Sequence, residues 1–151
     1  MRTLSATALL FVAALASAAT PVYDEAADAK AEIQSTLVQA QRAKVPVLVV
    51  FGANWCPDCK ILDMAFKSGA SAPLIQRHFK VVKVNVGKFD KNVDVADSYG
   101  LPLKSGIPAV VMLSPSGKVM YATRAGELAD ARNMGDTAIY EFFAKVAASK
   151  E

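Results

Sequence analysis

The stretch FGANWCPDCK (51–60) holds both cysteines of this 151-residue chain, Cys56 and Cys59, two residues apart. It follows VPVLVVF (45–51), an apolar run rich in β-branched residues that predicts a strand buried on both faces, as in a parallel sheet. KILDMAFKSG (60–69) comes next and carries its apolar residues on one helical face. The motif therefore joins a buried strand to a helix, with Cys56 at the N-terminus of that helix.

Two thiols at this spacing have three possible roles, and two of them fit poorly. A structural zinc site needs about four soft ligands, whereas the chain offers two cysteines and one histidine, His78. A purely structural disulfide stabilises a protein more when it closes a longer loop, and this loop is very short. Redox chemistry is the remaining interpretation.

The local sequence supports a redox role. Free backbone N–H groups and the positive end of the helix dipole stabilise a thiolate at Cys56. Pro57 suits the first helical turn, where no hydrogen bond is lost. Cys59, one turn further on, is placed to attack a mixed disulfide formed at Cys56. We therefore expect an exposed nucleophile and a shielded resolving thiol.

The rest of the chain predicts alternating helices and strands. One mixed sheet with helices on both faces, an α/β architecture, accommodates this order. The expected helices span 24–44, 60–69, 71–78, 92–100 and a C-terminal segment N-capped by Asp136; the expected strands span 45–51, 79–86, 107–113 and 118–123, with a loop over 87–92.

The first 20 residues, MRTLSATALLFVAALASAAT, have the pattern of a secretory signal peptide. Arg2 precedes an apolar core, and small residues follow it, so we expect residues 1–18 to be removed by cleavage after Ala18 or Ala19. An uncleaved membrane anchor is the alternative, although the apolar run is shorter than the roughly 20 residues of a span. Residues 19–151 form one domain. Its basic residues are scattered, which argues against a nucleic-acid partner.

The sequence WCPDC, followed about fifty residues later by GIPAVVML, resembles the thioredoxin fold, and more closely the exported thioredoxin-like proteins of Gram-negative bacteria. The resemblance covers roughly residues 45–122. It implies a set of roles: Cys56 attacks, Cys59 resolves, Trp55 flanks the site, Pro108 is a cis-proline facing the disulfide, and the backbone of Ile107 pairs with an extended substrate segment.

Two positions depart from that family. Thioredoxins carry a buried aspartate six residues before the first cysteine, and this chain has Val50 there. Lys83 falls near the lysine that partners this aspartate, so we expect the pair to be broken. Proton transfer from Cys59 would then depend on water, Asp58 or Lys83. The second departure is GKFDKNVD (87–94), which lengthens a loop of unassigned role.

Asp58 bears on the direction of electron flow. Its negative charge opposes a thiolate and is expected to raise the pKa of Cys56, and Lys60 offsets part of this effect. Asp58 also suits the first turn of a helix. A less stabilised thiolate makes a weaker oxidant, so we expect a moderately reducing enzyme.

The expected protein is a periplasmic, monomeric thiol–disulfide oxidoreductase that reduces protein or small-thiol disulfides. No cofactor is needed, because the two sulfurs carry the electrons. A membrane disulfide reductase would re-reduce it. The alternatives are an oxidase or isomerase of the same fold, or a binding module whose contact is gated by the redox state and which does not turn over.

Overall fold

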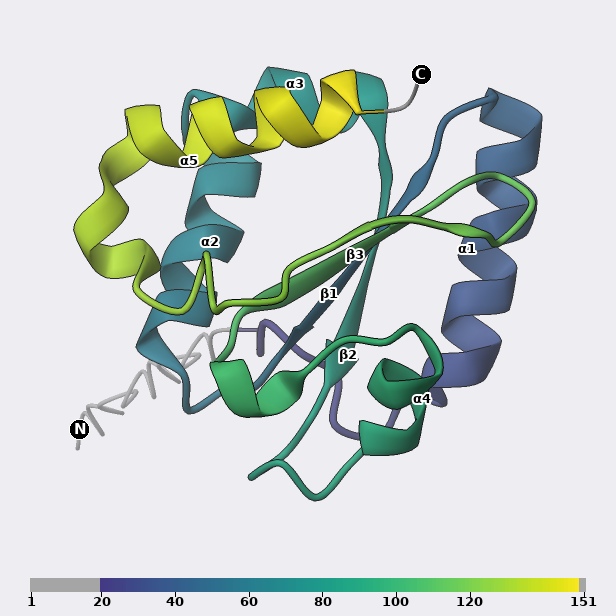
Figure 1. Cartoon of the computed structure of the whole chain (residues 1–151), viewed down its shortest axis with the longest axis horizontal. Coiled ribbons are helices and arrows are strands. Elements are labelled where there is room, and N and C mark those ends of the chain that lie inside the picture. The colour runs from purple at the N-terminus through teal and green to yellow at the C-terminus, as the bar shows by residue number, and fades with distance from the viewer. Residues whose placement is uncertain (1–19, 150–151) are drawn as a thin grey trace, which may run out of the picture.

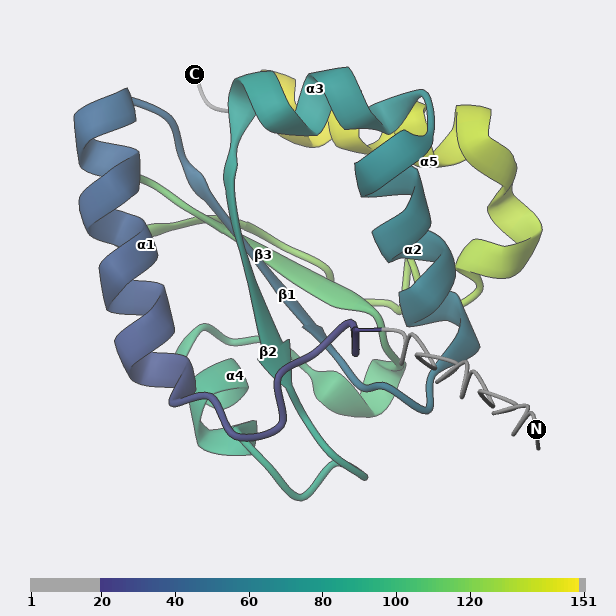
Figure 2. The same ribbon diagram turned by 180° about the vertical axis from the view of Figure 1, so that it is seen from behind.

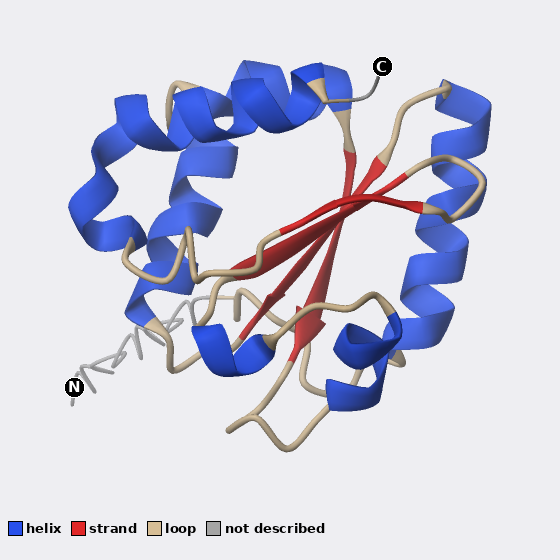
Figure 3. Ribbon diagram, in the orientation of Figure 1, coloured by secondary structure: helices blue, strands red, loops and turns tan. Residues whose placement is uncertain are grey.

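A computed structural model describes residues 20–149 and consists of a four-stranded mixed sheet with helices on both faces (Figures 1 and 3). The strand order is β2-β1-β3-β4. β1 pairs with β2 in parallel and with β3 antiparallel, and β3 and β4 form an antiparallel hairpin. The elements are α1 (Ala29–Ala43), β1 (Val47–Gly52), α2 (Pro57–Ser68), α3 (Ser71–His78), β2 (Lys80–Asn85), α4 (Val93–Ser98), the 3-10 helix η1 (Leu103–Ser105), β3 (Ala109–Leu113), β4 (Val119–Ala122) and α5 (Ala131–Ala148).

The central strand β1 separates two apolar cores. Val49 and Phe51 pack on the face covered by α1 and α4, whereas Leu48 and Val50 pack on the face covered by α2, α3 and α5. The two opposite views show these layers on either side of the sheet (Figures 1 and 2). Every residue of β1 is buried, which confirms the prediction of a strand covered on both faces.

The first helix begins later than its pattern predicted. α1 starts at Ala29 instead of residue 24, because the Asp28 carboxylate accepts a hydrogen bond from the backbone N–H of Ala31 and acts as the N-cap. The preceding residues instead lie against the segment between β1 and α2, where the backbone N–H of Tyr23 donates to Asn54 Oδ1. Tyr23 is 1% exposed there.

The C-terminal helix also differs from the prediction. α5 starts at Ala131 and passes through a kink at Gly135, whose φ of 74° is not helical. Asp136, predicted as the N-cap, instead accepts a hydrogen bond from the backbone N–H of Ala70 at 2.8 Å. This bond ties α5 to the start of α3.

Within residues 20–149, no helix has both the length and the apolar composition that crossing a membrane would require. The predicted signal peptide, residues 1–18, lies outside the described residues.

Candidate active site

Cys56 and Cys59 form a disulfide at the N-terminus of α2. Cys56 is the N-cap residue, and its sulfur accepts a hydrogen bond from the backbone N–H of Cys59 at 3.1 Å. Pro57 occupies the first helical turn, as expected. The first cysteine therefore lies where helix N–H groups and the helix dipole favour a negative sulfur.

Both cysteines are buried in this oxidised state. Cys56 is 3% exposed and Cys59 is 1% exposed, so the expectation of an exposed nucleophile is wrong here. Cys56 caps α2 and lies against the Ile107 carbonyl, whereas the preceding Trp55 is 52% exposed.

The segment before β3 faces the disulfide. The Ile107–Pro108 peptide bond is cis, as the resemblance implied. The Ile107 carbonyl oxygen lies 3.7 Å from Cys56 Sγ. Residues 51 positions apart in the chain thus meet at the site, and the backbone of Ile107 lies close to the Cys56 sulfur.

Most of the 87–94 segment is a loop, and α4 begins at its end, at Val93. The loop lies beside the active site through Trp55. The indole N–H of Trp55 donates to the Gly87 carbonyl at 2.7 Å, and the Trp55 and Phe89 rings meet edge to face, 6.1 Å apart. Phe89 is 44% exposed and has a φ of 62°. The lengthened loop therefore extends the apolar surface around the disulfide. Sequence reasoning left its position open.

Asp58 is buried, at 6% exposure, and has a partner that the sequence did not reveal. Its Oδ1 accepts hydrogen bonds from the backbone N–H of Arg132 at 2.9 Å and from Arg132 Nε at 3.1 Å. Lys60, expected to offset the charge of Asp58, is exposed. The main cation at Asp58 thus comes from α5, and the contact also fixes α2 against α5.

The aspartate–lysine pair of the family is absent, as expected, but Lys83 has a different carboxylate partner. Val50 and Lys83 are neighbours in the β1–β2 register, and Lys83 forms an ion pair with Asp63 of α2. Lys67 binds the other Asp63 oxygen at 2.8 Å. Burial raises the pKa of Asp63, but the hydrogen bonds and charges of Lys67 and Lys83 outweigh it, so the net pKa is lowered.

Sequence reasoning missed site residues that lie far from the cysteines along the chain. Tyr23 and Asn54 are joined by two hydrogen bonds between the Tyr23 backbone and the Asn54 side chain. Asp63 could have been predicted as a neighbour of Cys59, because residues four apart lie on the same face of a helix. No local signal marks Tyr23 or Arg132.

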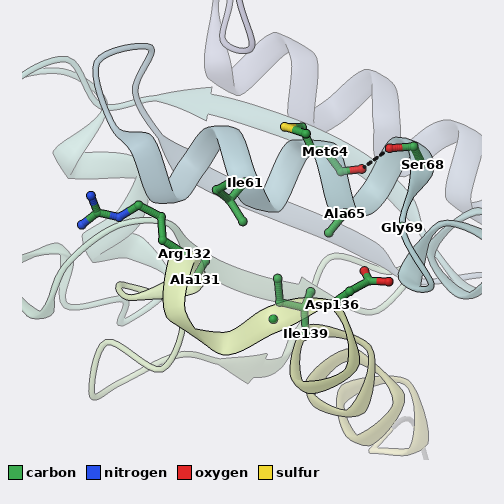
Figure 4. A pocket seen from close by; sticks show the side chains of 10 residues that line it. Ile61, Met64, Ala65, Ser68, Gly69, Ala131, Arg132, Asp136 and Ile139 are labelled. Atoms are coloured by element: carbon green, nitrogen blue, oxygen red, sulfur yellow. Dashed lines mark hydrogen bonds between the residues drawn. The ribbon is translucent and has the colours of Figure 1, made fainter.

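A pocket of about 210 Å³ lies behind the site, between α2 and α5. Figure 4 shows Ile61 and Ala65 of α2 opposite Ile139 of α5, with Arg132 and Asp136 at its two ends. The Arg132 that holds Asp58 therefore also borders this pocket. Among residues 20–149, no three His, Cys, Asp or Glu side chains gather closely enough to hold a metal ion.

Comparisons with known proteins agree with this geometry. A family model described as thioredoxin-like matches residues 28–115. A thioredoxin of Buchnera aphidicola is 33% identical over 82 residues, 54% of this chain and 67% of the relative. A thioredoxin of Pseudomonas aeruginosa is 37% identical over 87 residues, 58% and 71% of the two chains.

The crystal structure of a disulphide isomerase from Xylella fastidiosa superposes with a TM-score of 0.82 and 48% identity, covering 85% of this chain and 98% of that one. The fold and the helix-capping disulfide thus define a thiol–disulfide oxidoreductase. The chain belongs to the thioredoxin-like family.

Proposed function

We propose that this protein reduces disulfides of exported proteins, with Cys56 as the attacking and Cys59 as the resolving thiol. The observation that carries the proposal is the position of Cys56, capping α2 and 3.7 Å from the Ile107 carbonyl. A substrate segment that pairs with the backbone of Ile107 would bring its own disulfide to this sulfur.

The reaction is a pair of exchange steps. The Cys56 thiolate attacks one substrate sulfur, a mixed disulfide forms, and the other substrate sulfur leaves as a thiolate. Cys59 then attacks Cys56, which releases the second substrate thiol and leaves the Cys56–Cys59 disulfide. Two electrons pass to the substrate, and no cofactor takes part.

Asp58 supports the reducing direction. It is buried two residues from Cys56, and its negative charge makes the thiolate less favourable than a neutral or basic residue there would. Arg132 offsets part of that charge. In a site of this kind the disulfide is more stable relative to the dithiol than in a strong oxidant, so the reduction potential is lower.

Isomerisation is the second candidate, and one observation favours it. The 48% identical Xylella fastidiosa protein is described as a disulphide isomerase. An isomerase keeps a pool of reduced protein and attacks wrong disulfides without net electron transfer.

Insulin reduction tests the proposal, with dithiothreitol as the electron source. We expect many turnovers for the wild type and none for Cys56→Ser. Release of at most one equivalent would contradict an enzymatic reductase and favour a binding module. Recovery of activity in a substrate with scrambled disulfides, without turnover on insulin, would favour the isomerase.

We further propose that the protein works in the periplasm after export and is re-reduced there by a membrane disulfide reductase. The pattern of residues 1–20 supports export. A protein that reduces disulfides in an oxidising compartment needs a constant electron supply. Fractionation of cells that express the full chain tests the location, and a single cytoplasmic species of uncleaved mass would contradict it.

A further inference from the structure

Two hydrogen bonds join the N-terminal segment, residues 20–28, to the active-site loop, residues 53–56 between β1 and α2. The backbone N–H of Tyr23 donates to Asn54 Oδ1 at 2.9 Å, and Asn54 Nδ2 donates to the Tyr23 carbonyl at 2.9 Å. Asn54 Nδ2 also binds Glu25 Oε1 at 3.0 Å. Since Asn54 lies two residues before Cys56, the bonds set the position of Tyr23 relative to the disulfide.

The Tyr23 hydroxyl and the Cys59 sulfur border the same small space. A Cβ added to Gly52 would lie 2.8 Å from Cys59 Sγ and closer still to the Tyr23 hydroxyl. No side chain fits between these two groups, and Gly52 leaves the space open for them. The hydroxyl thus lies beside the sulfur that must lose a proton during resolution.

The Tyr23 hydroxyl keeps its proton. Burial, and then the negative charge of Asp63, hold the pKa of Tyr23 well above its ordinary value. A buried hydroxyl that does not ionise is a hydrogen-bond donor at every pH at which the enzyme works. A donor stabilises a neighbouring thiolate.

Asp63 is poorly suited to be the proton acceptor. It lies four residues after Cys59 on α2, hence on the same helical face. Lys83 and Lys67 hold it ionised and lower its pKa, which makes its carboxylate a weak base. The elements that carry or adjoin Cys59 also bear other charged groups. These are Asp58, Lys60 and Lys67 of α2, Lys83 of β2 paired with Asp63, Arg132 of α5 paired with Asp58, and Glu25 of the N-terminal segment bound to Asn54.

We infer that the Tyr23 hydroxyl donates a hydrogen bond to the Cys59 sulfur as this sulfur becomes a thiolate in the resolution step. The inference rests on the proposed exchange reaction. The S–H bond of Cys59 breaks, the Cys59–Cys56 bond forms, and the bond from Cys56 to the substrate sulfur breaks. The proton lost by Cys59 ends on the departing substrate thiolate, so no external base, oxidant or reductant is consumed.

The two exchange steps are separable with 5,5′-dithiobis(2-nitrobenzoate) and the fully reduced protein in stopped flow. Attack by Cys56 releases a first coloured thiolate, and resolution by Cys59 releases a second. Tyr23→Phe keeps the ring and removes the hydroxyl. We expect this variant to slow the second phase by roughly three- to tenfold and to move its pH midpoint upward, with the first phase unchanged.

Asp63→Asn is expected to shift the second phase in the opposite direction. Removing the negative charge while Lys83 stays in place favours the thiolate, so the pH midpoint of this phase moves down. Tyr121→Phe is the matched control, because Tyr121 packs on Phe142 on the opposite face of the molecule from α1. It is expected to leave both phases unchanged.

A second phase unaltered in Tyr23→Phe would overturn the inference. So would a second phase slowed in Asp63→Asn as much as in Tyr23→Phe, because Asp63 would then be the base. These readings need only the dithiol and a small probe. Failure of insulin reduction would contradict the proposed function while leaving both phases measurable.

Discussion

Replacing Asp58 by asparagine tests how the site sets its redox potential. The substitution keeps an oxygen that can accept from Arg132 and removes only the charge. Without the negative charge, the Cys56 thiolate is more stable. The reduced dithiol is then stabilised relative to the disulfide, and the reduction potential rises.

The size of the effect follows from the burial and pairing of Asp58. A one-unit change in the pKa of Cys56 corresponds to about 1.4 kcal/mol, or about 30 mV for a two-electron couple. Arg132 already offsets part of the charge, although its side chain is 54% exposed and screened by water. We therefore expect an upward shift of about 10–30 mV.

The same substitution has a stability cost. A hydrogen bond to an ionised acceptor contributes more than one to a neutral acceptor, and asparagine would offer Arg132 only a neutral amide oxygen. We expect a loss of about 1 kcal/mol, read as a Tm lower by about 4 °C.

Equilibration with glutathione buffers gives the potential. Trp55, the single tryptophan, directly precedes Cys56, so its fluorescence is expected to change with the redox state. Asp94→Asn is the matched control, because it removes the same charge from an exposed pair between α4 and α1. It should leave the potential unchanged. An Asp58→Asn potential that is unchanged or lower would refute the claim that Asp58 favours the reducing direction.

Two further predictions concern the surroundings of the disulfide. Pro108→Ala should slow substrate release and insulin turnover while lowering Tm only slightly. Turnover and substrate trapping equal to those of the wild type would show that Pro108 does not line the site. The ionised Asp63 should stabilise the fold above its ordinary pKa of about 4, and this contribution should be lost as pH falls toward its lowered folded pKa. The Tm of Asp63→Asn, compared with wild type from pH 7 to pH 2, should therefore show a deficit that shrinks below about pH 4. A deficit independent of pH would mean that the ion pairs of Asp63 do not stabilise the fold.

The sheet and most helices could be predicted because each depends on a short-range pattern. The continuous apolar run before the motif requires burial on both faces, and β1 is buried along its length. The alternation of Val82, Val84 and Val86 matches the buried side of β2 and the residue after it. The motif itself placed Cys56 at the N-cap of α2.

The surroundings of the cysteines could not be predicted in the same way, because they are long-range contacts. Arg132 reaches Asp58 across 74 positions of sequence, and Tyr23 reaches Asn54 across 31. Helix propensity alone placed residues 24–28 in α1, whereas bonds to the active-site loop and the Asp28 cap keep them out of it. The burial of Cys56 likewise depends on tertiary packing.

The central claim is the division of labour between Cys56 and Cys59, and trapping in cells tests it most directly. Cys59→Ser should accumulate mixed disulfides with exported proteins, because attack by Cys56 continues while resolution is lost. Cys56→Ser should accumulate almost none, because it lacks the thiol that caps α2 and lies beside the Ile107 carbonyl. The measurement is the amount of substrate-linked protein on non-reducing gels. These bands should be replaced by the free protein when the sample is reduced. Equal trapping by the two variants would contradict the assignment of attacking and resolving thiols.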